Sequence, residues 1–200
     1  MYLKKLFPLA LPLICAFTFV ACNNTTEETE TTATDSTTTM NNDASENEKA
    51  AVATLSGTGD TTLNGTVRFT EDDGKVKMEL QISVPQKANQ TVAVHIHQNG
   101  SCDNKGEAAG GHWNPTNKKH GKWGQGEFHS GDIGNVQLDG SGNGTMELET
   151  DLWSIGGDAN KDILNKSIVV HGGTDDFTSQ PAGNAGARIG CGVIQQSGGM

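Results

Sequence analysis

Aromatic residues are scarce in this chain: phenylalanine, tryptophan and tyrosine together make up 5% of its 200 residues. Basic residues are also few, with 14 lysines and arginines against 24 acidic residues and a net charge of -10. The lysines form no basic stripe, which argues against nucleic acid as a partner. No segment has a sustained 3.6-residue hydrophobic period, so the sequence offers no amphipathic helix for a membrane surface.

Only one long apolar run is present, at residues 6–21, directly behind two lysines. This is the layout of a secretory signal, and the run is at the low edge of the roughly 17 to 25 residues that a membrane-spanning helix needs. Residues 19–22, Phe-Val-Ala-Cys, resemble a bacterial lipobox in which Cys22 is acylated, although phenylalanine stands where leucine is usual. The alternatives are a cleaved signal with an incidental cysteine and a poorer match at Cys15. We therefore predict a signal at 1–22 and an exported protein of the periplasm or cell envelope, held to the membrane by an N-terminal lipid anchor.

The next segment, residues 23–48, contains almost nothing apolar. It has seven acidic residues and no lysine or arginine. Such a segment cannot bury enough surface to offset its ordering entropy, so we expect a flexible, Thr-rich acidic tether. The remaining domain, residues 49–200, has 17 acidic and 12 basic residues, a net charge of -5.

From residue 49 onward the sequence alternates between short apolar runs and turns. In residues 76–82 every second side chain is apolar, so one face of a strand meets a core and the other meets water. Turn signals at Asp73-Gly74, Asp139-Gly140 and Asn143-Gly144 suit antiparallel hairpins. About eight such runs predict an all-β antiparallel sandwich or flattened barrel: 51–55, 66–69, 76–84, 91–97, 136–138, 145–148, 167–171 and 188–194.

Two long Gly-rich intervals, residues 98–132 and 172–187, break this rhythm and are expected to be functional or disordered loops. Most of the chemically reactive side chains lie in or beside them. His95 and His97 stand two apart in an expected strand, so both rings project from one face. The simpler alternative is a polar outer face opposite a core of Val94 and Ile96. Further imidazole and carboxylate groups follow, of the kinds that zinc and copper(II) prefer: His112, His120, His129, Asp132 and His171.

Four groups of residues, in this order, resemble the successive signatures of the copper/zinc superoxide dismutase family. They are His-Ile-His at 95–97, Gly-Gly-His-Trp-Asn-Pro at 110–115, His-Ser-Gly-Asp-Ile-Gly-Asn at 129–135, and Gly-Asn-Ala-Gly-Ala-Arg at 183–188 with Cys-Gly-Val-Ile at 191–194. The match covers essentially all of 50–195. The resemblance implies an eight-stranded Greek-key β-sandwich. It also implies that the substrate is superoxide, which is disproportionated to dioxygen and hydrogen peroxide.

The resemblance implies two metal sites that share one histidine. The copper ligands would be His95, His97, His112 and His171, and the zinc ligands His112, His120, His129 and Asp132. All six histidines of the chain are then used. Two residues would be catalytic: His112, which bridges the metals and takes up a proton, and Arg188, whose permanent charge attracts and orients a small anion. The alternative for Arg188 is a surface ion pair.

Further structural roles follow from the same resemblance. Asp175 would tie a copper ligand to a zinc ligand and fix ring orientation, the alternative being a solvated loop acid. Cys102 and Cys191 would form a disulfide, as an exported protein meets an oxidising compartment. Closing an 89-residue loop stabilises the fold by roughly 4 to 5 kcal/mol in the chain-entropy model. The alternative is two free buried thiols.

One departure from the family pattern affects substrate capture. The loop 172–187 contains no lysine and lacks the lysine/glutamate steering group of many family members. Since the domain is acidic, fast capture of an anion needs a local positive field, for which Lys118, Lys119 and Lys122 are candidates.

Two other functions remain open. One is a copper- and zinc-buffering lipoprotein with little dismutase activity, and loss of Arg188 or a copper ligand would have favoured it. The other is a purely structural β-sandwich, against which six histidines at ligand intervals argue. A homodimer is a further hypothesis, with no surface assigned because the family's dimers use different ones.

Overall fold

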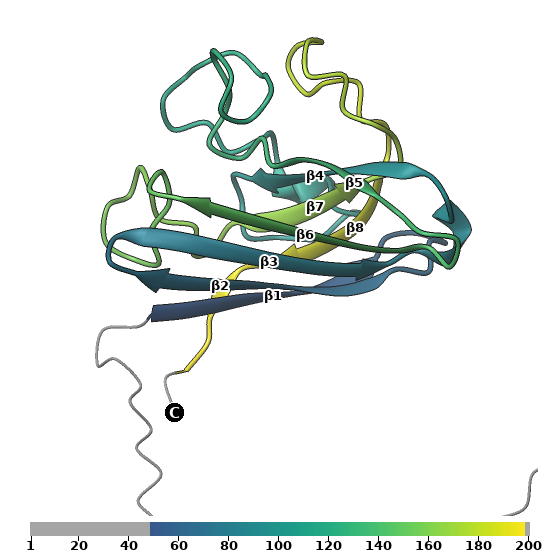
Figure 1. Ribbon diagram of the computed structural model, residues 1–200, viewed down its shortest axis with the longest axis horizontal. Coiled ribbons are helices and arrows are strands. Elements are labelled where there is room, and N and C mark those ends of the chain that lie inside the picture. Colours follow the sequence, from purple (N-terminus) through teal and green to yellow (C-terminus); the bar gives the residue numbers. More distant parts are fainter. Residues whose placement is uncertain (1–48, 199–200) are drawn as a thin grey trace, which may run out of the picture. The chain divides into compact units, whose positions relative to one another are not determined.

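The computed structural model describes residues 49–198 (Figure 1). The predicted signal at 1–22 and tether at 23–48 lie outside the described residues. The described part is built from strands, with two short 3-10 helices and no α-helix. Their bounds are β1 Lys49–Gly57, β2 Asn64–Asp72, β3 Lys75–Ser83, η1 Pro85–Lys87, β4 Thr91–His97, η2 Glu107–Ala109, β5 Gly134–Gln137, β6 Asn143–Thr150, β7 Ser167–His171, β8 Arg188–Val193 and β9 Gln195–Gln196. Within 49–198, no helix has the length and apolar character required to cross a bilayer.

The strands form where the sequence alternates between apolar and polar residues. In β3 the buried side chains are Val76, Met78, Leu80 and Ile82, and the residues between them are more exposed. Burying an apolar side chain of this size stabilises the fold by about 1.5–3 kcal/mol. The inward faces of the strands together make one continuous apolar core.

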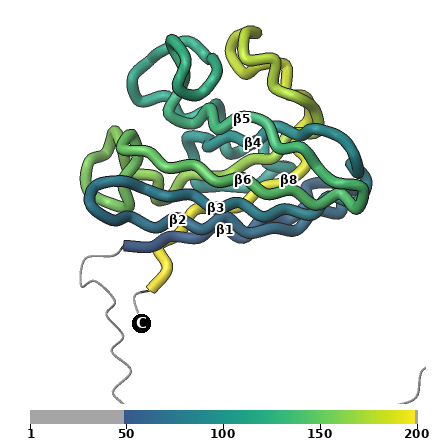
Figure 2. Tube along the Cα trace, in the orientation of Figure 1, coloured from purple at the N-terminus to yellow at the C-terminus, as the bar shows by residue number. Residues whose placement is uncertain are grey.

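The sheet is antiparallel throughout, in the order β5-β4-β7-β8-β1-β2-β3-β6, and β9 pairs with β1. Its two edge strands, β5 and β6, follow each other in the chain and are joined by a turn in which the Asp139 amide donates to the Asn143 carbonyl at 2.8 Å. The sheet therefore curls into a nearly closed barrel, as the trace in Figure 2 shows. The predicted all-β sandwich or flattened barrel is confirmed.

Two of the three predicted turns join strands and one does not. Asp73 and Gly74 both have positive φ, 45° and 73°, and link β2 to β3 as a two-residue turn. Asp139-Gly140 lies in the β5–β6 connection. The prediction for Asn143-Gly144 was wrong, because both residues begin β6 and pair with β3. Gly144 is required by packing: a Cβ there would lie 2.6 Å from Val136 Cγ1.

Both predicted long loops are present: the first long loop lies between β4 and β5, and the second long loop lies between β7 and β8. Figure 1 shows them standing at the same side of the barrel, above β4 and β5. A third loop, residues 151–166 between β6 and β7, was not singled out from the sequence. It places Trp153 in the core, where the indole Nε1 donates to the Ser130 carbonyl at 2.8 Å. Because Ser130 belongs to the first long loop, the third loop supports the first through this hydrogen bond.

Candidate metal centre

Strands β4 and β7 provide the rigid side of the site. They are paired in register, with His95 opposite Val169 and Ala93 opposite His171. His95 and His97 are fully or almost fully buried, so the alternative of a polar outer face is wrong. His171 ends β7 at a register shift in its pairing with β8. His112, from the first long loop, forms an isolated backbone bridge with His97.

The structure gathers the predicted ligands into two clusters. In each, one ligand atom from every residue lies within 4.8 Å of the others. The first cluster is His95, His97, His112 and His171; the second cluster is His112, His120, His129 and Asp132. His112 belongs to both clusters, and all seven residues are buried.

The second cluster has the dimensions of a tetrahedral metal site. Asp132 Oδ1 lies 2.7 Å from His112 Nδ1, 3.0 Å from His120 Nδ1 and 3.1 Å from His129 Nδ1. A tetrahedron with zinc–ligand bonds of about 2.0–2.1 Å has edges of roughly 3.3 Å. The second carboxylate oxygen, Oδ2, accepts backbone N–H groups from Gly121 and His129 and so fixes the carboxylate orientation.

The first cluster consists of nitrogen donors. Nε2 of His97 and Nε2 of His171 are 3.3 Å apart. The rings of His95 and His112 lie beside them, with centroids 4.0 Å apart. Four imidazoles around one point suit copper(II), which prefers nitrogen ligands in a tetragonal arrangement.

In every histidine ring except that of His112, the nitrogen that points away from the metal clusters is hydrogen-bonded to a protein acceptor. His97 Nδ1 donates to the Gly110 carbonyl at 2.8 Å and His171 Nδ1 donates to the Gly186 carbonyl at 3.2 Å. His129 Nε2 donates to the Lys118 carbonyl at 3.0 Å. Such contacts fix the tautomer and aim the other nitrogen at a metal. His112 differs, because its Nδ1 belongs to the second cluster and its Nε2 faces the first.

Asp175 completes this set from the second long loop. Its Oδ2 lies 2.8 Å from His95 Nε2 and its Oδ1 lies 2.9 Å from His120 Nε2, so one carboxylate joins the two clusters. Asp175 is 1% exposed and is not a solvated acid. Burial opposes ionisation, but the hydrogen bonds from His120 and His95 outweigh it and lower the pKa of Asp175.

Several inward nitrogens make no hydrogen bond of acceptable geometry to the protein, and this is the test of whether metal ions fit. Within residues 49–198, the buried atoms without a hydrogen bond include His95 Nδ1, His112 Nε2, His120 Nδ1 and His129 Nδ1. An unpaired buried polar group is destabilising by about 1–3 kcal/mol. Two metal ions would satisfy all four atoms, so the residues present fit copper and zinc.

The environment of three rings in the first cluster disfavours their protonated form, which leaves them able to bind a cation. Burial, followed by the neighbouring rings, lowers the pKa of His97 to about 2 and that of His171 to about 3. Burial also lowers the pKa of His112 to about 4. These rings are therefore neutral at neutral pH, with lone pairs free. For His120, burial is outweighed by the carboxylates Asp132 and Asp175, which raise its pKa to about 9.

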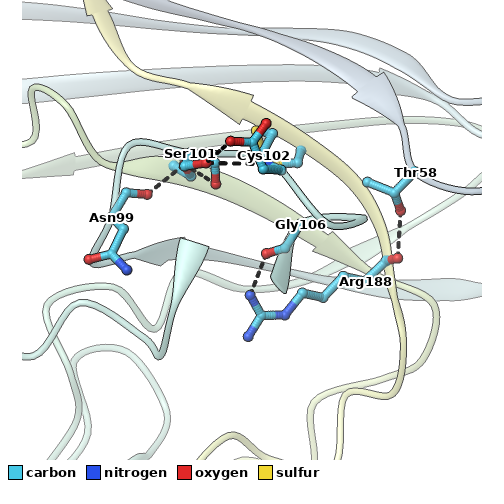
Figure 3. Close-up of a disulfide and its surroundings, with 9 residues drawn as sticks. Thr58, Asn99, Ser101, Cys102, Gly106 and Arg188 are labelled. Atoms are coloured by element: carbon cyan, nitrogen blue, oxygen red, sulfur yellow. Dashed lines mark hydrogen bonds between the residues drawn. A yellow bond between two sulfur atoms is a disulfide. The ribbon is translucent and has the colours of Figure 1, made fainter. Parts of the chain in front are cut away.

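The predicted disulfide between Cys102 and Cys191 is confirmed, and Arg188 lies further along the same strand, β8 (Figure 3). The bridge joins the first long loop to β8. Arg188, the first residue of β8, donates from Nη1 to the Gly106 carbonyl at 2.6 Å and from Nη2 to the Gly110 carbonyl at 2.7 Å. Its Nε lies 3.8 Å from the exposed Glu107. Backbone carbonyls rather than a surface ion pair thus hold the guanidinium.

A cavity of about 570 Å³ opens onto the first cluster. Its lining includes Arg188 together with His97, His112 and His171. Lys118 and Lys119 also line it, whereas the Lys122 ammonium lies 5.7 Å from the centre of the Phe177 ring. A second hollow, of about 590 Å³, is lined by β1, β2, β3 and β6 residues, none of them titratable.

Sequence reasoning missed residues that act through their backbone or through amide side chains. The Gly110 carbonyl accepts hydrogen bonds from both His97 and Arg188. Asn135 and Gln180 hold backbone groups of Asp175 and His120. Glycine, asparagine and glutamine are common loop residues, so only the position of Asn135 within a recognised signature could have drawn attention to it.

Comparison with known proteins gives one family. The family model for copper/zinc superoxide dismutase matches residues 63–194. A protein named Superoxide dismutase [Cu-Zn] from Talaromyces marneffei is 38% identical over 151 residues, covering 72% of this chain and 96% of the relative. One of the same name from Candida albicans is 38% identical over 145 residues, covering 68% and 92%.

A bacterial relative and a solved structure agree with these matches. Superoxide dismutase [Cu-Zn] 1 of Aquifex aeolicus is 38% identical over 111 residues, covering 54% of this chain and 66% of the relative. The crystal structure of the clock protein EA4 superposes with a TM-score of 0.65 at 32% identity, covering 73% of this chain and 93% of that one.

Proposed function

Because this chain belongs to the copper/zinc superoxide dismutase family, we infer that it disproportionates superoxide to dioxygen and hydrogen peroxide. Two superoxide anions and two protons give one molecule of each product. Copper and zinc are its cofactors. When bound, copper supplies the one-electron redox chemistry, and zinc, which has none, orders its ligands.

The observation that carries this function is the position of His112. Its ring has one nitrogen in each cluster, its Nε2 is a buried atom with no hydrogen-bond partner, and the residue lines the cavity. We propose the first cluster as the copper site, the second as the zinc site and His112 as the bridge. His112 Nε2 could take up and release a proton at the cavity that a small anion would enter.

Arg188 binds and orients the anion. The two carbonyls that accept from Nη1 and Nη2 restrain the guanidinium at the wall of the cavity. A planar, permanently charged group attracts a small anion and costs little reorganisation. Lys118 and Lys119, in the first long loop, add positive charge, and we propose that they take the place of the steering group absent from 172–187.

A direct test starts from the chain without residues 1–22, loaded with one copper and one zinc per chain. Superoxide decay is followed by pulse radiolysis at neutral pH. Turnover far above that of free buffer is expected. Both metals bound without turnover would instead favour the copper- and zinc-buffering lipoprotein, an alternative that the presence of Arg188 in the cavity disfavours.

We further propose that the protein is exported and anchored through a lipid on Cys22, on the basis of the apolar run at 6–21 and the lipobox-like Phe-Val-Ala-Cys. Labelled palmitate should be incorporated into the wild-type chain and not into Cys22→Ser, which should leave the membrane fraction. Unchanged labelling of Cys22→Ser would contradict the anchor. The homodimer hypothesis is tested separately by sedimentation equilibrium of the chain without residues 1–22.

A further inference from the structure

Gln180 contacts the backbone of His120 with both atoms of its side-chain amide. Its Oε1 accepts the His120 N–H at 2.9 Å and its Nε2 donates to the His120 carbonyl at 3.0 Å. We propose that Gln180 is a positioning residue for the second metal cluster, holding His120 in the orientation that binds zinc. This rests on the proposed function to the extent that zinc occupies that cluster.

His120 needs such a partner because of where it lies. It sits in an irregular stretch of the first long loop, outside any strand. Among residues 49–198, its backbone N–H and carbonyl have no backbone partner, and the Gln180 amide satisfies both. A buried backbone N–H or carbonyl that has no partner is destabilising, so these two bonds favour one conformation at His120.

The second long loop thus fixes His120 at two levels. Asp175 Oδ1 holds the ring at Nε2, and Gln180, five residues further along, holds the backbone. Together they fix where Nδ1 points, which is toward Asp132 at 3.0 Å. A ligand restrained at both ring and backbone loses little freedom on binding a metal, which strengthens binding.

A similar pair of hydrogen bonds joins strand β5 to the second long loop, through the side-chain amide of Asn135. Asn135 Nδ2 donates to the Asp175 carbonyl at 2.9 Å, and Asn135 Oδ1 accepts the Asp175 N–H at 2.9 Å. One amide therefore holds the residue that grips the His120 ring, and the other holds the His120 backbone. Gln180 is exposed, unlike a residue kept for core packing, and it lines the cavity beside Lys118 and Lys119.

The test compares zinc binding without copper in three variants of the chain lacking residues 1–22. Gln180→Met keeps the length and removes both hydrogen bonds; Gln180→Glu keeps an acceptor for the His120 N–H. Gln125→Met is the matched control, an exposed glutamine in the same loop as His120. Zinc affinity is measured by competition with a chromophoric chelator, and amide exchange at His120 by NMR.

We expect Gln180→Met to bind zinc about tenfold more weakly and to exchange the His120 amide at least tenfold faster, with Gln125→Met unchanged. Gln180→Glu should retain the slow exchange. Zinc affinity of Gln180→Met within twofold of wild type, or an equal loss in Gln125→Met, would overturn the proposal. Neither readout uses superoxide, so a wild-type chain that binds zinc but lacks turnover would remove the proposed activity and leave this result standing.

Discussion

At the scale of single residues, function depends on how each histidine divides its two nitrogens. Five rings donate one nitrogen to a protein acceptor and keep the other for a metal cluster, whereas His112 gives both to clusters. The acceptors are mostly backbone carbonyls, such as those of Gly110 and Gly186. Substituting a neighbouring side chain therefore leaves most of these orientations intact.

Arg188 is the residue whose charge we propose binds and orients the anion. Arg188→Met should lower kcat/KM for superoxide at least tenfold, since the anion loses its fixed cationic partner in the cavity. Arg188→Lys should fall between, because an ammonium cannot bridge the Gly106 and Gly110 carbonyls as a planar fork does. Copper and zinc content, measured by mass spectrometry, should match wild type in both. Unchanged kcat/KM in Arg188→Met would refute the assigned role.

At the scale of elements, loops rather than strands complete the site, and each loop is tied to another part of the fold. The disulfide joins the first long loop to β8, and Asp175 joins the second long loop to both clusters. The third loop, 151–166, contributes through Trp153, which packs edge-on against Phe69 and Trp123. Irregular segments can hold ligands accurately when such long-range contacts replace the regular bonds of a sheet.

Trp153→Phe tests the contribution of this third loop. The smaller ring leaves a cavity and removes the donor to the Ser130 carbonyl, next to His129, so unfolding free energy should fall by about 2–4 kcal/mol. Denaturant unfolding of the metal-free protein measures this. Trp123→Phe, at a partly buried position, is the control and should lose less. Equal losses would show that the Ser130 contact contributes nothing specific.

At the scale of the whole molecule, the residues around the cavity are positively charged although the domain as a whole is negative. The domain 49–200 has net charge -5, while the cavity over the first cluster is lined by Arg188, Lys118 and Lys119. A local positive field in an acidic protein attracts anions to one place and repels them elsewhere. Such a field is screened over about 10 Å at 0.1 M salt, so its effect is measurable through ionic strength.

Neutralising Lys118 and Lys119 together to glutamine should lower kcat/KM severalfold at low salt, and the difference should shrink as ionic strength rises. The matched control is Lys122→Gln with Lys161→Gln, which changes net charge equally outside the cavity lining. Stopped-flow or pulse-radiolysis rates from 10 to 300 mM salt give both curves. Identical curves for the two double variants would assign the effect to net charge alone.

The metal-free protein should be most stable near pH 6.5. His97, His171 and His112 have folded pKa values of about 2, 3 and 4, below the ordinary 6.5, so their stabilisation is present above pH 6.5 and is lost as pH falls. His120, with a pKa of about 9, stabilises below 6.5 and loses that contribution between 6.5 and 9. Each of these groups changes the free energy of unfolding by up to about 1.4 kcal/mol per pH unit. Denaturant unfolding with a chelator present, from pH 4.5 to 9, measures the free energy of unfolding at each pH. A free energy that does not change with pH would contradict these pKa shifts.

The sequence alone determined the ligand types, their order along the chain and the strands that carry part of them. Alternation places His95 and His97 on one strand whatever the rest of the fold does, because side-chain direction in a strand has a period of two. The family resemblance named the remaining ligand positions, Asp175 and the disulfide partners in advance. Failure came at Asn143-Gly144, where a turn signal was in fact a packing requirement inside the barrel.

Only the tertiary structure decided which loop atoms meet. Local preferences do not fix the conformation of residues 98–132 and 172–187, which, apart from the three-residue helix η2, have no regular hydrogen-bond pattern. Contacts between residues far apart in sequence fix it instead, such as the 60 positions that separate Gln180 from His120. The same reason explains why Lys118 and Lys119, but not Lys122, line the cavity. The period of apolar residues in the sequence determines which face of a strand each side chain is on. Which loops meet depends on closure of the barrel, because that closure brings together segments far apart in the sequence.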